Sequence, residues 1–207
     1  MKYPKLRELK QAIKALVKGP YTSKYPFEPH VPFPQFRGKP EYDEKRCVGC
    51  GACAQVCPAR AIDVVDDTAG KEPSRELILH YDTCIFCGQC QANCITDEGI
   101  KLTNEYDLAL FDRKKAVVSV KKPLVVCDAC RTVIGAKDHL VFLARKLGLL
   151  SYANPTLVLA SQKELKLIED EQPSDLPPPP VRADMFRVLC PKCRHKVVIS
   201  DIRGYKT

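Results

Sequence analysis

The sequence contains no long hydrophobic run. A helix that crosses a membrane needs about 18 or more largely apolar residues, and the best apolar stretch, residues 140–150, is interrupted by Arg145 and Lys146. We therefore expect no transmembrane span. A secretory signal is also lacking, which predicts a reducing compartment in which disulfides are rare.

Histidine is scarce, and no compact basic surface is evident. The chain has four histidines in 207 residues, and none lies in a recognisable motif, although His195 follows Cys193 closely. The net charge of +8 is spread along the chain, without the combined basic and aromatic surface on which single-stranded nucleic acids stack. We expect no nucleic-acid partner. The unusual feature is the presence of twelve cysteines, which predict metal ligation in a chain without a secretory signal.

Eight of these cysteines form two runs with the same spacing, C-x2-C-x2-C-x3-C. The first run is Cys47, Cys50, Cys53 and Cys57, and the second is Cys84, Cys87, Cys90 and Cys94. Bacterial-type ferredoxins hold [4Fe–4S] clusters with this run, and the fourth cysteine of each run ligates the other cluster. We therefore assign one cluster to Cys47, Cys50, Cys53 and Cys94, and the other to Cys84, Cys87, Cys90 and Cys57.

Two alternatives to clusters are a disulfide framework and a pair of zinc knuckles. Disulfides need an oxidising compartment, and zinc sites have no use for a third cysteine at the same interval. Gly51 and Gly88 occupy matching positions in the two runs, where a side chain would obstruct the approach of backbone to a cluster. Pro58 follows the first run, whereas Ile95 stands in the corresponding place after the second. Proline is not a ligand, so we expect both clusters to be held.

The first forty residues predict a helix followed by an extended segment. Apolar residues recur at helical spacing from Tyr3 to Lys18, the opposite face is basic, and Gly19-Pro20 ends the pattern. Such a helix lies on an anionic membrane or a membrane subunit, or else packs on a soluble surface. Residues 21–40 are rich in proline and aromatic side chains, which predicts a stiff strap laid over a neighbouring surface.

We expect an α+β chain in four parts: the helix and docking strap (1–40), a dicluster ferredoxin domain (41–106), a linker (107–122) and a zinc-ribbon-like domain (123–207). Within the ferredoxin domain, short strands are expected at 61–65, 76–80 and 99–103, together with two short helices around the clusters. A domain of this kind has little apolar core, so metal binding contributes much of its folding free energy.

The remaining four cysteines form two C-x2-C knuckles. They are Cys127 and Cys130, after an expected strand at 124–126, and Cys190 and Cys193. Two knuckles on strand hairpins are typical of a zinc ribbon. We favour zinc over a rubredoxin-type iron, which uses the same four thiolates, because nothing in the spacing calls for redox activity.

Further elements are expected around the second knuckle and between the two. Strands are expected at 186–189 and 196–200, on either side of the second knuckle, and a helical insertion is expected at 136–170. The insertion should contain one helix over 136–147 and a shorter one over about 161–169, before an acidic, Pro-rich loop.

Three adjoining motifs carry a family resemblance. They are Phe36-Arg37-Gly38-Lys39-Pro40, Tyr42-Asp43 and Cys47-Val48-Gly49-Cys50-Gly51-Ala52-Cys53. They resemble the ferredoxin-like subunit of membrane-bound group 4 [NiFe] hydrogenases, itself similar to the eight-iron subunit of respiratory complex I. Residues 104–113 resemble the segment that follows the second run in both. The resemblance extends to about residue 115. The C-terminal four-cysteine extension is absent from the complex I version, and it looks like that of the corresponding subunit of formate hydrogenlyase.

The resemblance implies an electron relay without a catalytic site of its own. Electrons would pass from an electron-input iron–sulfur subunit through two [4Fe–4S] clusters to the small and large hydrogenase subunits. Residues 1–40 would dock on the membrane arm, placing the chain peripherally on the cytoplasmic face within a hetero-oligomeric complex. The alternatives are a complex I-type quinone oxidoreductase subunit and a soluble ferredoxin carrier. Lys45, Arg46 and Arg60 lie near ligands in sequence and could raise a cluster potential by favouring its reduced state. We interpret them instead as solvated surface charges.

Overall fold

The computed structural model describes residues 5–70, 72–167 and 187–202, and the chain divides into two compact units, Met1–Phe36 and Arg37–Thr207. The first unit contains helix α1 (Leu6–Lys18). At its start the Lys5 N–H donates to Glu8 Oε2 at 3.1 Å. At its end Gly19 adopts a φ of 74°, a conformation that glycine tolerates.

The apolar face of α1 is not covered within its own unit. No residue of the helix is buried, and Leu6 and Leu16 are 87% and 85% exposed. The strap that follows also exposes Phe27 and Phe33, at 93% and 81%. The described part of the predicted helix agrees with expectation, and its first two predicted residues lie outside the described range. Among the described residues, no helix is long and apolar enough to cross a membrane.

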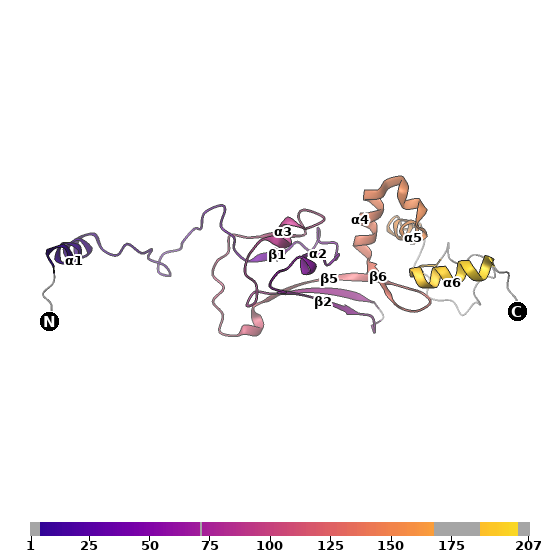
Figure 1. Cartoon of the computed structure of the whole chain (residues 1–207), viewed down its shortest axis with the longest axis horizontal. Coiled ribbons are helices and arrows are strands. Elements are labelled where there is room, and N and C mark those ends of the chain that lie inside the picture. Colours follow the sequence, from indigo (N-terminus) through magenta and orange to yellow (C-terminus); the bar gives the residue numbers. More distant parts are fainter. Residues whose placement is uncertain (1–4, 71, 168–186, 203–207) are drawn as a thin grey trace. The chain divides into compact units, whose positions relative to one another are not determined.

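The second unit begins with a small two-stranded sheet and two short helices. Strand β1 (Pro40–Tyr42) pairs antiparallel with β4 (Ile100–Leu102). Helices α2 (Ala52–Gln55) and α3 (Gln89–Ala92) each follow the glycine that ends a C-x2-C-G turn, and they contact one another (Figure 1). These elements match the expected ferredoxin core.

A four-stranded antiparallel sheet supports this core. Its order is β2 (Ile62–Asp67), β3 (Ser74–His80), β5 (Val117–Val126) and β6 (Val133–Ala136). Buried side chains of the sheet pack on the cysteine-bearing loops; they include Ile62, Leu77, Leu79 and Val120.

Strand β5 corrects the expected linker over 107–122, because residues 117–122 pair with β3 along its length. The physical reason is a two-residue alternation in β5, which buries Val120, Lys122 and Leu124 on one face. The lysine within that alternation masks the apolar pattern in the sequence.

The C-terminal part is largely helical. A 3₁₀ turn, η1 (Arg113–Lys115), precedes β5, and α4 (Lys137–Leu147), η2 (Gly148–Ala153) and α5 (Pro155–Glu164) follow β6. Helix α5 starts six residues before the expected position, since Asn154 caps it and proline occupies its first position. The acidic, Pro-rich loop lies outside the described residues.

Helix α6 (Pro191–Ile202) corrects the strand expected at 196–200. Residues 187–189, also expected as strand, have no regular structure. The β-branched residues at 197–199 favour a strand locally, but Pro191 is suited to the first position of a helix. Cys193 and Val197, four residues apart on one helix face, pack on the cluster of Cys127, Leu189 and Cys190. A ribbon with two strand hairpins is therefore wrong for this chain: the second knuckle opens into a helix.

Candidate metal centres

The eight cysteines of the two runs line two cavities. The first, partly open to solvent, is lined by Cys47, Cys50, Cys53 and Cys94. The second, also partly open, is lined by Cys57, Cys84, Cys87 and Cys90. The fourth cysteine of each run thus lies with the first three of the other run. This grouping has the same membership as the crossed ligand sets expected from the spacing.

The two runs fold into matching turns. Gly51 and Gly88 have the same left-handed conformation, φ 79° with ψ 5° and 4°, and each begins a short helix. A Cβ at either position would meet only ordinary contacts, at 3.8 and 3.6 Å. Within the polypeptide, the need for glycine therefore comes from the backbone conformation. Gly49 and Phe86 also match, with φ of 68° and 53°.

The segment after the second run is packed closely against the first. Gly99 is buried, and a Cβ there would lie 3.1 Å from Cys94 Sγ and 3.2 Å from Cys47 Cα. The Asp43 N–H donates to the Gly99 carbonyl at 3.1 Å. Gly99 therefore holds the crossing cysteine beside the first run.

Backbone donors surround the sulfur atoms. N–H groups point at several of them, including Ala52 N to Cys50 Sγ at 3.5 Å, Ala61 N to Cys57 Sγ at 3.3 Å and Phe86 N to Cys84 Sγ at 3.4 Å. Hydrogen bonds of this kind stabilise anionic sulfur and tune the potential of a cluster.

Burial acts in the opposite direction on the free thiols. It raises the pKa of Cys53 to about 12 and that of Cys90 to about 11. At Cys94 burial also opposes ionisation, but hydrogen bonds from Thr96, Gly99 and Ile100 outweigh it and lower the pKa. Iron must displace these protons, so cluster binding is coupled to pH and to folding.

The two cavities follow one another along the same elements. On β3, Leu77 lines the first cavity and Leu79 lines the second. On β4, Ile100 lines the first cavity and Leu102 lines the second. Residues two apart on a strand share a face and are separated by about 7 Å. Tyr42 lies between the two sets, since its hydroxyl is 3.9 Å from Cys53 Sγ and the charge of Cys90 also acts on it. The two sites are therefore neighbours.

The donor sets distinguish clusters from single ions. Among the described residues, a close group of potential ligands is formed by Cys127, Cys130, Cys190 and Cys193, whose sulfur atoms lie within 4.8 Å of one another. The eight cysteines around the cavities form no such group in the part of the chain that the structure describes. Wider spacing around a cavity fits a multi-iron cluster, whereas convergence on one point fits a single ion.

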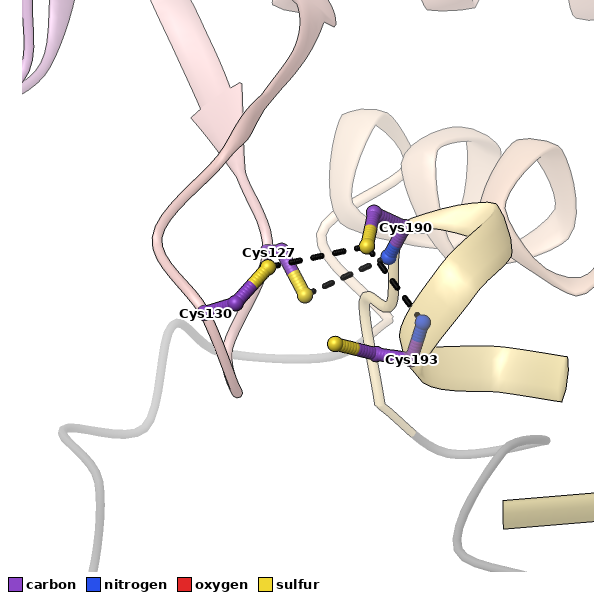
Figure 2. Close-up of side chains that lie close together, drawn as sticks. All are labelled: Cys127, Cys130, Cys190 and Cys193. Carbon is purple, nitrogen blue, oxygen red and sulfur yellow. Dashed lines mark hydrogen bonds between the residues drawn. The ribbon is translucent and has the colours of Figure 1, made fainter. Parts of the chain in front are cut away.

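The four converging cysteines come from two distant segments. Figure 2 shows Cys127 and Cys130 on the loop between β5 and β6, facing Cys190 and Cys193 at the start of α6. Tetrahedral ligation at about 2.3 Å places sulfur atoms about 3.8 Å apart, and Cys130 Sγ lies 3.6 Å from Cys190 Sγ. The set fits one tetrahedral ion.

Hydrogen bonds tie the two knuckles together. The Cys190 N–H donates to Cys127 Sγ at 3.3 Å (Figure 2). Asp128 and Val188 bind reciprocally, with the Asp128 N–H on the Val188 carbonyl at 2.9 Å and the Val188 N–H on the carboxylate at 2.8 Å. These bonds hold residues some sixty positions apart in one site.

The thiols of this site differ in pKa. A hydrogen bond with Thr132 lowers the pKa of Cys130 to about 6, whereas hydrogen bonds to the Cys130 and Cys190 sulfurs raise the pKa of Cys193 to about 12. Four adjacent thiolates repel one another, so a cation is what allows all four to ionise together.

The comparisons with known proteins agree with this geometry. Residues 46–97 match the 4Fe-4S dicluster domain family. NADH-quinone oxidoreductase subunit I 2 of Geobacter metallireducens is 34% identical over 120 residues, covering 55% of this chain and 91% of the relative. Formate hydrogenlyase subunit 6 of Escherichia coli is 40% identical over 140 residues, covering 66% of this chain and 76% of the relative.

Two other similarities are shorter or looser. NAD(P)H-quinone oxidoreductase subunit I of Gloeobacter violaceus is 36% identical over 98 residues, and the match spans 46% of that relative's length. A chain of the membrane-bound sulfane sulfur reductase, an archaeal respiratory membrane complex, is 33% identical, with a TM-score of 0.39 over 56% of this chain and 61% of that one.

The matched turns and the two cysteine-lined cavities define a dicluster ferredoxin-type electron carrier. The chain belongs to the family of iron–sulfur electron-transfer subunits that includes NADH-quinone oxidoreductase subunit I and formate hydrogenlyase subunit 6. These are electron-transfer subunits of oxidoreductase complexes, and catalysis is the task of other subunits.

Two cations that are far from the first run in sequence contact its loop in the structure. Lys45, Arg46 and Arg60 are exposed, as expected for surface charges. The structure instead places Lys122 of β5 and Arg75 of β3 against the loop that carries Cys47. Sequence reasoning missed both, since Lys122 fell in the expected linker. The signal that would have found it is the alternating pattern of β5.

Proposed function

We propose that this chain is the electron-relay subunit of a membrane-bound [NiFe] hydrogenase of the formate hydrogenlyase type. The observation that carries the proposal is the pair of adjacent cavities, each lined by three cysteines of one run and the fourth of the other. A [4Fe–4S] cluster takes up and releases single electrons. Two neighbouring clusters pass an electron across the domain, from an electron-input iron–sulfur subunit to the hydrogenase small and large subunits.

The crossed ligand sets have a mechanical consequence. Cys94 and Cys57 each tie one run to the other site, so neither cluster can assemble without positioning residues of both runs. The polypeptide contributes backbone N–H donors to the sulfur atoms and a largely apolar lining from β3 and β4. These residues hold the two sites at a fixed separation and limit access of water to them.

The hydrogenase branch is supported by the four-cysteine site in the C-terminal part. The formate hydrogenlyase subunit matches more of this chain, 66%, than the Geobacter quinone oxidoreductase subunit does, at 55%. The second candidate is a complex I-type subunit that delivers electrons to a quinone site. It is favoured by the 91% coverage of the Geobacter relative.

The C-terminal site is proposed to bind one zinc ion through Cys127, Cys130, Cys190 and Cys193. Support comes from the convergence of the four sulfur atoms and from the hydrogen bonds that link the knuckles. Zinc there is structural: it fastens α6 to the loop after β5. Iron in place of zinc would make the site a third redox centre of rubredoxin type.

Residues 1–40 are proposed to dock on the membrane arm at the cytoplasmic face. Within its own unit α1 leaves its apolar residues exposed, and its polar face carries mostly lysine and arginine. An amphipathic helix with this charge binds an anionic interface or a membrane subunit. The exposed aromatic residues of the strap supply further apolar area for the same contact.

Isolation of the native complex tests the proposal. Anaerobic, detergent-solubilised purification through a tag on this chain should recover a nickel-containing large subunit, a small hydrogenase subunit and a membrane arm. Recovery of a quinone-site subunit without nickel would assign the chain to the complex I branch. Recovery of the chain alone in the soluble fraction would contradict both and indicate a diffusible carrier.

A further inference from the structure

Lys122 is a buried cation beside the first cysteine run. It lies on β5, is 8% exposed, and has its side chain on the same face as Val120 and Leu124. Its Nζ donates to the Glu44 carbonyl at 2.6 Å and to Asp138 Oδ2 at 2.9 Å. Glu44 precedes Cys47 by three residues, so the ammonium group anchors the loop that enters the first site.

A second cation reinforces the same loop from the neighbouring strand. Arg75 is the direct cross-strand partner of Lys122 in the β3–β5 pair, and its Nη1 donates to the Gly49 carbonyl at 3.2 Å. The two cations thus bind the backbone on both sides of Cys47. Like charges directly opposite each other in a sheet are destabilising, so nearby anions are needed to offset the repulsion between Arg75 and Lys122.

Acidic partners compensate the two cations unequally. Arg75 is fully engaged by Asp66, with hydrogen bonds of 2.7 and 2.8 Å. Within the described part of the chain, the ion-pair partner of Lys122 is Asp138, whose side chain is 41% exposed while the lysine side chain is 10% exposed. The carboxylate is therefore better solvated than the ammonium, so it offsets the charge of Lys122 only in part.

The remaining positive charge acts on the first cysteine set. Lys122 binds the peptide three residues before Cys47 and also lies against Gly49, two residues after it, so its charge is placed beside the loop that carries Cys47 and Cys50. The chain is packed tightly here, since a Cβ on Gly49 would lie 3.0 Å from Lys122 Cβ. Reduction adds one electron to a cluster, and a nearby cation stabilises the more negative state.

We propose that Lys122 is a potential-setting residue: its buried ammonium raises the reduction potential of the cluster held by Cys47, Cys50, Cys53 and Cys94, and Asp138 moderates the effect. The proposal rests on the cluster assignment in the proposed function. Asp138 lies in the first turn of α4. The C-terminal part is therefore coupled to the first cluster through one ion pair, although it contributes no ligand to either cluster.

The test is an anaerobic redox titration of the full chain, followed by electron paramagnetic resonance. The first cluster is identified as the one whose signal Cys53→Ser alters. Lys122→Met should lower its midpoint potential, so that its reduced-to-oxidised ratio at the wild-type midpoint falls on the order of three- to tenfold. Lys121→Met is the matched control: it removes the same charge from the exposed face of β5 and should leave both midpoints unchanged.

Asp138→Asn separates an electrostatic role from a structural one. Removal of the carboxylate leaves Lys122 unopposed and should raise the midpoint of the first cluster, opposite to Lys122→Met. Shifts in the same direction, or an unchanged midpoint in Lys122→Met with both clusters assembled, would overturn the proposal. If Lys122→Met fails to assemble the first cluster, the midpoint potential of that cluster in Asp138→Asn is the test: a rise supports the proposal, and a fall or no change overturns it. A wild-type chain with fewer than two clusters would contradict the proposed function instead.

Discussion

Substitution of Gly99 by alanine should damage one cluster and spare the other. Gly99 is buried between the crossing cysteine and the first run, and an added Cβ would lie 2.9 Å from Thr96 Oγ1, 3.1 Å from Cys94 Sγ and 3.2 Å from Cys47 Cα. Carbon atoms in good contact are about 3.5–4.0 Å apart. The methyl group is therefore several tenths of an ångström too close to three neighbours at once.

The size of the effect follows from those contacts. Overpacking of a well-packed interior costs about 1–3 kcal/mol, and here the strain falls on two of the four cysteines proposed to hold the first cluster. The easiest relief is a movement of the Cys94 sulfur or a rotation of Thr96, which also donates to or accepts from that sulfur at 3.3 Å. We expect weakened retention of the first cluster, seen as a loss approaching half of the bound iron.

Iron content and electron paramagnetic resonance of the anaerobically purified chain measure this loss. Gly70→Ala is the matched control, because Gly70 is exposed and an added Cβ would meet its nearest neighbour, the Glu72 carbonyl oxygen, at 3.8 Å. The second cluster should keep its signal in both variants. Full iron content in Gly99→Ala, or equal loss of both clusters, would refute the reasoning.

Other predictions concern parts outside the clusters. Asp66→Asn should lower stability by about 1 kcal/mol at neutral pH, because Asp66 binds Arg75 through two hydrogen bonds. Arg75 holds the pKa of Asp66 below its ordinary value, so the difference should be full above about pH 4 and vanish in stronger acid, as urea midpoints would report. Cys127→Ser should remove one metal ion per chain while both iron–sulfur signals persist; loss of those signals would show that the site is not independent. Ile13→Glu should reduce membrane association, and unchanged cosedimentation with membranes would remove the docking role of α1.

The sequence was most informative where covalent chemistry fixes spacing. The cysteines that line each cavity are those grouped by the expected crossed assignment, which stays a prediction, and the short strands and helices around them lie close to the expected positions. The ligand spacing itself dictates the turns: Gly51 and Gly88 take the same left-handed conformation because each run makes the same turn. In these two turns the sequence spacing alone is enough to predict the backbone conformation.

Prediction from the sequence failed where packing between distant segments determines the local conformation or the burial of a side chain. The β-branched residues of α6 favour a strand, yet the segment is helical, and Cys193 and Val197 are partly buried against the cluster of Cys127, Leu189 and Cys190. Likewise Lys122 has no local reason to be buried. Its position depends on the pairing of β5 with β3 and on Asp138, which lies sixteen residues away. Neither pairing can be read from neighbouring residues.

The central claim is that this chain holds two [4Fe–4S] clusters in crossed sets, and serine variants of the two crossing ligands test it most directly. Electron paramagnetic resonance of Cys94→Ser should show the same altered signal as Cys53→Ser, and Cys57→Ser should alter the other. Eight iron atoms per wild-type chain should accompany these spectra. If Cys94→Ser instead altered the signal that depends on Cys87, each run would hold its own cluster and the account would be contradicted.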